Sequence, residues 1–402
     1  MITIFYPPYS FGGDAIYLYR LCTELVRRGH EVDVIHDADS FHMFGAKADP
    51  KAFPVSEGMT IHKLESGVGV LAPLLAHQTG RPVLTGGKIA LILASKKFDV
   101  VHFHNASLFG PRIMEIEPSY TTVKLYTAHD HWLVCPTNVL WKNRSHACDE
   151  PTCLSCMLIS RRPPQWWRYT GMMERSSRGV DQFLAPSRFC ADMHHARGFT
   201  RPIEVLNYFL PPFEDDPSEA APAPHPRPYF LFVGRLEDYK GVQDLIPHFQ
   251  GPGDYDLVVV GTGNYESELR GQAEGVERVH FAGWVAQADI GPYYRHALAA
   301  LVPSTTFETF GIIVIEAYAR GVPVIVRDLG ALPEVVREGR GGLVFGSPAE
   351  LGSHLERVAS DENFRRELGE TGHRSYLEKW TPDSHIHRYE EIIERVRRAK
   401  SA

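Results

Sequence analysis

Two basic side chains stand just beyond an apolar segment in the second half of the sequence. The segment PYFLFVG is typical of a buried strand and continues into GRLEDYKG, which carries Arg235 and Lys240. Ligands bind at the carboxyl edge of open α/β sheets, where these two residues would lie. A planar guanidinium and an ammonium point charge together suit two linked phosphates. The pair is therefore a candidate diphosphate site, and two solvated loop charges are the alternative.

Two carboxylates follow at a spacing of eight residues, Glu308 in the loop of PSTTFETFG and Glu316 in the apolar stretch after it. We expect Gly311 to open a helix there, so that both carboxylates face one crevice if the loop folds back. Amides of Gly311 and Ile312 would then point at phosphate oxygens. A carboxylate among apolar neighbours needs partners, and either two ribose hydroxyls or a salt bridge to Arg320 would serve Glu316.

Short β-rich runs alternate with longer helical patterns along the chain, which is typical of parallel sheets crossed by helices. In the first half, strands are predicted at residues 2–6, 31–35, 100–104, 123–127 and 183–185. A second series is predicted at residues 229–233, 256–260, 279–281, 299–302 and 324–326. The sequence therefore predicts an α/β protein with two sheets.

The 402 residues exceed the size at which a single core stops growing, so we expect two domains. Residues 210–228 include PPFEDDPSEAAPAPHPRP, whose seven prolines predict an extended linker. The linker separates an N-terminal domain, 1–209, from a C-terminal domain, 229–380. Helical spacing of apolar residues in 381–402 predicts an amphipathic helix, which we expect to pack back on the first domain.

Composition excludes several classes of protein. A net charge of −7 argues against a broad nucleic-acid footprint, and no apolar run approaches the length of a membrane span. The N-terminus shows neither a basic leader nor a small-residue cleavage site. We expect a cytoplasmic protein without a transmembrane segment or a nucleic-acid partner, and peripheral contact with the inner face of a membrane is left open.

Four of the six cysteines, Cys135, Cys148, Cys153 and Cys156, fall within 22 residues. Four thiolates complete a tetrahedral zinc shell, so we predict a structural zinc in the loop 135–156. The C-x4-C-x2-C portion is similar to ferredoxin spacing, which leaves an iron–sulfur cluster as one alternative. Two disulfides or free thiols are another, although a reducing cytoplasm disfavours disulfides.

Glycines and histidines mark the first domain. Gly12 and Gly13 precede an amphipathic helix and would let the backbone approach a phosphate, or form an ordinary turn. His129 ends a predicted strand in LYTAHDHW, and a metal site shared with His131 is a less favoured hypothesis. We expect His102 to be a hydrogen-bonded core residue. The tryptophans near the cysteine loop, Trp141, Trp166 and Trp167, are either platforms for an acceptor or packing residues.

The ordered set of GRLEDYKG, GTGNYESEL, FAGWV, PSTTFETFG with Glu316, and GVPVIVRDLGALPEVV resembles glycosyltransferase family 4, the retaining GT-B enzymes. The resemblance covers nearly all of the second domain. It implies two Rossmann-like domains facing a cleft, with a C-terminal crossover helix. It also implies that Arg235 and Lys240 bind the diphosphate of a nucleotide-sugar donor, and that Glu316 binds the ribose.

The resemblance implies further roles. Glu308 and the backbone of Phe310, Gly311 and Ile312 would bind the sugar and the phosphates. The loop at Trp284 and Val285 would meet the base. The glycine turn at Gly12 and Gly13 resembles the family's N-terminal loop, and His129 would contact the transferred sugar. His129 and Glu308 are thus the predicted catalytic residues, with no divalent metal needed for the chemistry.

We therefore expect a retaining hexosyltransferase that uses a UDP-sugar, or next a GDP-sugar, and a glycan, lipid-linked or small-molecule acceptor. A sugar-nucleotide epimerase or a phosphorylase on the same fold is one alternative. A non-catalytic sugar-binding scaffold is the other, and the intact set Arg235, Lys240, Glu308 and Glu316 counts against it.

Overall fold

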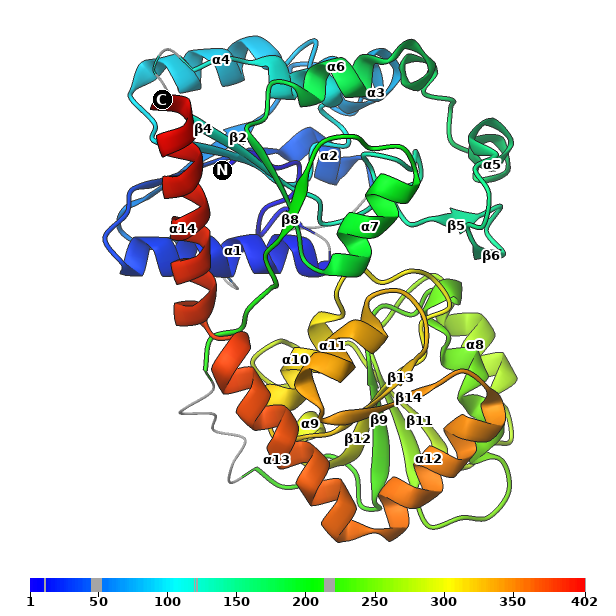
Figure 1. Ribbon diagram of the computed structural model, residues 1–402. Helices are drawn as coiled ribbons and strands as arrows, with labels where there is room; N and C mark the ends of the chain where they lie inside the picture. The colour runs from blue at the N-terminus through cyan, green and yellow to red at the C-terminus, as the bar shows by residue number, and fades with distance from the viewer. Residues whose placement is uncertain (11, 45–52, 119, 121, 213–220, 402) are drawn as a thin grey trace. The chain divides into compact units, whose positions relative to one another are not determined.

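The computed structural model describes residues 1–10, 12–44, 53–118, 120, 122–212 and 221–401. The chain divides into two compact units (Figure 1). The first unit comprises Met1–Val139, Glu150–Tyr208 and His385–Ala402, and the second comprises Leu140–Asp149 and Phe209–Ser384. Residues 213–220 of the predicted linker lie outside the described residues.

The first unit contains a parallel sheet. Its strands, in spatial order, are β2 (Met59–Leu64) and β1 (Val32–Asp37), then β3 (Val100–Phe103), β4 (Val123–Thr127), β7 (Gln182–Ala185) and β8 (Ile203–Val205). Ile2 bridges Ile35 on one side and Phe103 on the other, so the N-terminal segment joins the two groups of strands. The strand predicted at 2–6 is not formed: Ile2 alone bridges the sheet, and the chain turns at Tyr6, which pairs with Tyr9.

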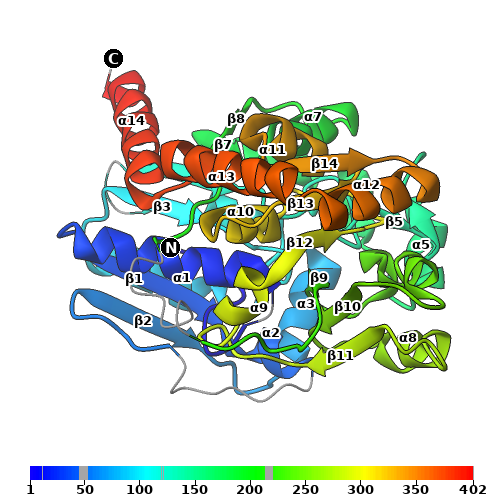
Figure 2. The same cartoon turned by 90° about the horizontal axis from the view of Figure 1, so that it is seen from below.

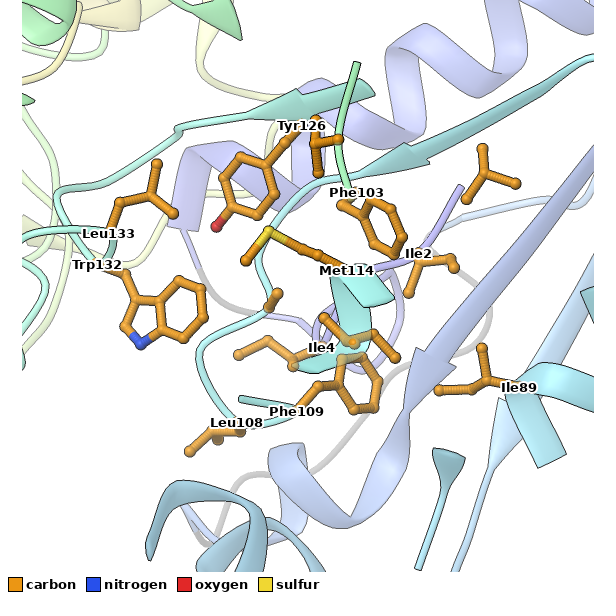
Figure 3. Close-up of a cluster of buried hydrophobic side chains, with 14 of the residues drawn as sticks. Ile2, Ile4, Ile89, Phe103, Leu108, Phe109, Met114, Tyr126, Trp132 and Leu133 are labelled. Atoms are coloured by element: carbon orange, nitrogen blue, oxygen red, sulfur yellow. The ribbon is translucent and has the colours of Figure 1, made fainter. Parts of the chain in front are cut away.

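Helices and 3₁₀ turns connect these strands. They are α1 (Gly12–Arg27), α2 (Ala38–His42), α3 (Leu71–Thr79), α4 (Gly86–Ser95), η2 (Pro111–Glu115), α5 (Cys153–Ile159), η3 (Trp166–Thr170), α6 (Met172–Ser177) and α7 (Arg188–Ala196). Apolar side chains from the central strands and the connecting segments form the core, among them Ile2, Ile4, Phe103, Phe109 and Met114 (Figure 3). This core holds the ends of β3 and β4 in place.

The second unit contains a six-stranded parallel sheet. Its strands, in spatial order, are β11 (Val279–Gly283), β10 (Asp256–Val260), β9 (Tyr229–Val233), β12 (Ala297–Val302), β13 (Val324–Arg327) and β14 (Gly342–Phe345) (Figure 2). Every residue of β10, DLVVV, is buried, as expected for a strand of a parallel sheet covered by helices on both faces. Chain order reverses between β9 and β12, which makes this the switch point of the sheet.

The connections of the second unit are mainly helical. The helices are α8 (Glu266–Gln272), α9 (Gly291–Arg295), α10 (Ile312–Ala319), α11 (Leu332–Gly339), α12 (Pro348–Ser360) and α13 (Glu362–Lys379). Three 3₁₀ turns follow β9: η5 (Asp238–Lys240), η6 (Val242–Asp244) and η7 (Ile246–Phe249). A short antiparallel hairpin of β5 (Trp141–Lys142) and β6 (His146–Ala147) also belongs to this unit, although its neighbours in sequence belong to the first.

The last helix, α14 (Pro382–Ser401), belongs to the first unit from His385 onward. Arg388 pairs with Glu204 at 2.6 Å, and the hydroxyl of Tyr389 lies 2.9 Å from Nδ1 of His102. These contacts attach the C-terminal segment to β8 and to β3. None of the helices in the described ranges has the length and apolarity that a membrane crossing requires.

Candidate functional site

The loop after β9 carries the first two candidate residues, Arg235 and Lys240. The loop is held on one side because the Leu236 amide donates to Thr262 at 3.0 Å. On the other side the Thr305 amide donates to the carbonyl of Tyr239 at 2.9 Å. Both neighbouring segments follow the carboxyl ends of strands, β10 and β12. The loop therefore sits at the switch point of the sheet, between its two halves.

Gly241 ends this loop in a conformation that other residues avoid. Its φ is +77°, and a Cβ atom placed there would lie 2.0 Å from the carbonyl oxygen of Pro303. A side chain at this position would separate the loop from the end of β12. Glycine thus permits the close backbone approach that fixes Lys240, its preceding residue, beside the segment that begins at Pro303.

Lys240 and Glu308 form an ion pair, which the sequence did not predict. The Lys240 ammonium donates to Oε1 of Glu308 at 2.6 Å, and the Ser304 hydroxyl donates to the same oxygen at 2.7 Å. Burial raises the pKa of the Glu308 carboxyl, but the Lys240 ammonium, the Ser304 hydroxyl and Arg235 together outweigh burial and hold that pKa below its ordinary value. Glu308 is therefore an ionised carboxylate beside a fixed cation.

Arg235 is the more accessible of the two basic residues. Its side chain is 57% exposed, against 24% for Lys240. It donates to the Tyr239 hydroxyl at 2.9 Å and lies 3.7 Å from Glu237. Because the guanidinium has five donors, these contacts leave it able to bind an anion as well.

Helix α10 follows the Glu308 loop. Gly311 stands directly before it with φ of +94°, and Phe310 is buried. The first amides of a helix have no partner within it, so the amide of Ile312, the first residue of α10, is a candidate donor. The Val314 amide already donates to the Gly311 carbonyl at 2.9 Å. This arrangement gives the loop a positive helix terminus close in sequence to a carboxylate.

Glu316 is buried within α10. Its Oε2 accepts from the hydroxyl of Tyr294 at 3.1 Å, a partner that the sequence did not suggest. Arg320, the alternative partner considered from the sequence, donates to the backbone carbonyl of Glu316 at 3.1 Å. Trp284, in the loop predicted to meet a base, is 72% exposed, and Val285 beside it is half-buried.

Trp141 is a residue of this neighbourhood that sequence reasoning placed elsewhere. It lies in the hairpin of β5 and β6, and its ring centroid is 6.4 Å from that of Tyr239. Tyr239 is the residue whose hydroxyl accepts from Arg235. The sequence offered a tryptophan in the cysteine-rich loop, but no pattern that joined it to the segment after β9.

His129 lies in the first unit, just after β4, and is buried. Its Nδ1 lies 2.6 Å from the Tyr208 hydroxyl, and its Nε2 lies 2.8 Å from Nδ1 of His104. Burial lowers the pKa of His129 to about 3, so the ring is neutral at physiological pH. The two partners fix the orientation of the ring and determine which nitrogen carries the proton.

Two further buried histidines, His102 and His385, extend this group of polar side chains to α14. His102 contacts Thr127 through Nε2 at 2.8 Å and Tyr389 through Nδ1 at 2.9 Å, so it is a hydrogen-bonded core residue. His385 lies 3.0 Å from the Tyr17 hydroxyl, and burial lowers its pKa to about 4. The predicted strand end at β4 is therefore surrounded by neutral imidazoles and hydroxyls.

The glycine turn opens α1. Gly12 has φ of +76° and is exposed, as is Gly13. A Cβ atom at Gly12 would meet Oδ1 of Asp14 at 3.4 Å, which is ordinary contact distance, so the positive φ favours glycine there.

The cysteines of the loop 135–156 are thiols. Cys135 and Cys156 are buried, and Cys148 and Cys153 are partly buried. Within the described ranges, two other groups bring three ligand atoms within 4.8 Å of one another, and neither includes a cysteine of this loop. One is His131 with Cys190 and His194; the other lies in the second unit. The zinc in the cysteine loop stays a prediction.

Two family models match the chain. The model for group 1 glycosyl transferases matches residues 214–375, and the model for glycosyltransferase family 4 matches residues 11–209. Among curated relatives, an uncharacterized glycosyltransferase of Methanocaldococcus jannaschii is 25% identical over 96% of this chain and 94% of that protein. A phosphatidyl-myo-inositol mannosyltransferase of Mycobacterium leprae is 37% identical over 34% of this chain and 38% of that protein.

Solved structures share the fold along nearly the whole chain. Sucrose-phosphate synthase from Thermosynechococcus elongatus aligns with a TM-score of 0.74 at 19% identity, over 99% of this chain and 96% of that one. HepE of Anabaena, solved with UDP and glucose, aligns with a TM-score of 0.68 at 16% identity, over 98% and 99% of the two chains. These likenesses show that the two Rossmann-like units are those of the GT-B fold.

Proposed function

Because the chain belongs to glycosyltransferase family 4 and is a glycosyltransferase of the GT-B fold, we propose that it transfers a hexosyl group from a nucleotide-diphosphate sugar with retention of anomeric configuration. A UDP-sugar is the favoured donor, and a GDP-sugar is next. HepE of Anabaena, which shares the fold, was solved with UDP and glucose. The acceptor is a glycan, a lipid-linked sugar or a small molecule.

The cation pair after β9 is the observation that carries the proposal. Arg235 and Lys240 lie at the switch point of the second sheet, where open α/β sheets bind ligands. Lys240 is already fixed by Glu308 at 2.6 Å, so little side-chain freedom is lost when an anion binds. A mobile lysine and arginine at a strand end would bind a diphosphate less well, because both would lose rotamer entropy.

The same arrangement supports the chemistry of the departing diphosphate. Negative charge grows on the diphosphate as the bond to the sugar breaks, and fixed donors stabilise that charge without reorganising. Arg235, Lys240 and the first amides of α10 are the donors in our proposal. The diphosphate oxygen accepts the proton of the acceptor hydroxyl on the face from which it departs, which retains the configuration. No protein nucleophile takes part.

His129 in the first unit and Glu316 in the second have further roles in the proposal. In our proposal His129 contacts the transferred sugar, and its ring brings no charge to that contact because it is neutral. Glu316 accepts from the ribose hydroxyls, and Tyr294 holds its carboxylate in place. A structural zinc on the four thiols of the loop 135–156 is part of the proposal, with no role in the transfer step.

Exposed apolar side chains favour a lipid-linked acceptor among the three classes. Leu71, Leu74 and Leu75 on α3 are 56%, 39% and 44% exposed, and they recur at helical spacing. Such a stripe suits the boundary between lipid head groups and acyl chains. Co-sedimentation with anionic vesicles tests this assignment, and a chain that stays in the supernatant would point to a soluble acceptor.

A panel of UDP-, GDP-, ADP- and dTDP-sugars tests the donor. We expect slow hydrolysis of one donor class without acceptor, and binding of the matching free nucleotide with a raised melting temperature. NMR of the product then gives the anomeric configuration. An inverted product would refute retention, and the absence of any nucleotide binding would support the non-catalytic scaffold instead.

A further inference from the structure

Three side chains of the kinds that bind metal ions meet at the amino-terminal edge of the second sheet. Asp256 is the first residue of β10, His280 is the second residue of β11, and His225 lies four residues before β9. Parallel strands begin at a common edge, so these residues lie at the opposite ends of the strands from Arg235 and Lys240. Neither the proposed transfer nor the family resemblance uses them.

The three side chains converge on one point. Nε2 of His225 lies 2.7 Å from Oδ2 of Asp256, and Nε2 of His280 lies 3.1 Å from the same oxygen. The ring centroids of the two histidines are 4.4 Å apart. All three ligand atoms lie within 4.8 Å of one another.

The carboxylate at the centre of the group is held firmly. The Asp256 side chain is 2% exposed, and its backbone amide donates to the Pro228 carbonyl at 2.9 Å. Its other oxygen, Oδ1, lies 3.4 Å from the guanidinium of Arg227. Arg227 therefore occupies the side of the carboxylate that faces away from the histidines, and Oδ2 remains directed at them.

Two imidazole nitrogens and one carboxylate oxygen are a common ligand set for zinc and related divalent transition metals. Metal–ligand bonds of about 2.0–2.2 Å in tetrahedral geometry place ligand atoms roughly 3.3 Å apart. The two observed separations, 2.7 and 3.1 Å, need to widen by about 0.6 and 0.2 Å to reach this value. The His280 side chain is 41% exposed, which leaves water free to complete the shell.

We propose that His225, Asp256 and His280 bind one divalent transition-metal ion of the zinc type. Without the ion, the carboxylate accepts hydrogen bonds from the N–H groups of both imidazoles. When the ion binds, it takes the place of these protons, and both imidazoles bind it through the lone pair of Nε2. It ties the segment that enters the second unit to the first residues of β10 and β11. The role is structural, because the group lies at the edge opposite the proposed donor site.

Metal titration of the tag-free chain, after chelator treatment, tests the proposal. Cu²⁺ followed by electron paramagnetic resonance reports imidazole nitrogen ligands, whereas thiolates of the cysteine loop give sulfur-to-metal charge-transfer bands. His280→Gln removes one ligand from a half-exposed position. His296→Gln is the matched control. Nε2 of His296 lies 3.0 Å from the carbonyl oxygen of Ala221, in the same segment as His225, but His296 is not one of the three proposed ligands.

We expect one imidazole-bound ion per chain in the wild type and in His296→Gln. His280→Gln should bind the metal ion more weakly than the wild type, by a factor larger than about 10–100. A loss of about 10–100-fold is typical when a residue that only supports a metal ligand is removed. Zinc should raise the melting temperature of the wild type and of the control more than that of His280→Gln. Asp256→Asn, which keeps the size of the side chain, provides a second variant if His280→Gln does not fold.

Several results would overturn the assignment. A wild-type chain without nitrogen hyperfine structure has no such site. Equal affinity in the wild type and His280→Gln would place the ion elsewhere, and an equal loss in His296→Gln would make the effect one of local folding. Donor binding is measured on the same samples, and its failure would count against the proposed function alone.

Discussion

Replacing Lys240 with methionine separates the structural and the chemical roles of the pair with Glu308. The 2.6 Å contact is a charge-assisted hydrogen bond between side chains that are 24% and 20% exposed. Bonds of this kind contribute about 1.5–3 kcal/mol, and partial exposure places this one near the lower end. Lys240→Met also leaves Glu308 ionised and only partly solvated. We expect the free energy of unfolding to fall by about 2 kcal/mol at pH 7.

The loss should depend on pH. The pKa of Glu308 is lowered in the folded state, so the pair stabilises the fold above the ordinary carboxyl pKa. That stabilisation disappears as the pH falls through the folded value. In Lys240→Met the pKa of Glu308 rises, and the carboxyl protonates at a higher pH. The difference in stability between wild type and variant should therefore shrink as the pH is lowered from 7 toward 4.

A double variant completes the test. Lys240→Met with Glu308→Gln removes the uncompensated charge, so we expect it to recover about 1–2 kcal/mol relative to Lys240→Met. Transfer activity should not recover, since loss of one donor to a developing oxyanion costs about 10²–10³-fold in kcat. Urea unfolding gives the first quantity and steady-state kinetics with the accepted donor gives the second.

Two results would refute this reasoning. Restored activity in the double variant would mean that Lys240 acts only by neutralising Glu308. Wild-type donor affinity and kcat in Lys240→Met would mean that the diphosphate binds elsewhere.

Three further predictions follow from the contacts of the histidines and of Trp141. His104→Phe removes a hydrogen-bond partner of His129 and should lower kcat about 10–30-fold with little change in KM for the donor. A merely structural effect would change stability without lowering kcat relative to KM. His129 and His385 are neutral in the fold with pKa values of about 3 and about 4, so lowering the pH from 6.5 to 5 should cost about 1.6 kcal/mol for each. A first unit equally stable at both pH values would contradict this. Trp141→Ala should raise KM for the donor about 2–10-fold through loss of its contact with Tyr239, as measured by steady-state kinetics. An unchanged KM would exclude the contact from the site.

Most strands that the sequence predicted are central ones, and β11, predicted at residues 279–281, is an edge strand. The strands at 229–233 and 256–260 have the predicted bounds, because both faces are covered and every residue is apolar or at the strand start. Five strands of the described residues escaped prediction: β2, β8 and β14 are edge strands, and β5 and β6 form a hairpin of two-residue strands. An edge strand is only partly buried, so it lacks the continuous apolar run on which such predictions depend. The terminal helix, in contrast, was visible from its amphipathic spacing.

The sequence by itself determined the fold class and which residues lie at the carboxyl ends of strands. Each segment is buried on its own faces, so the spacing of apolar residues along the chain indicates which segments are strands and which are helices. Arg235 and Lys240 could be placed in this way, because they come directly after a single predicted strand. Partners distant in sequence were decided only by the tertiary structure. Lys240 and Glu308 are 68 residues apart, and their contact depends on the strand order that places β12 beside β9. His225, Asp256 and His280 meet for the same reason, since local patterns carry no information about which strands become neighbours.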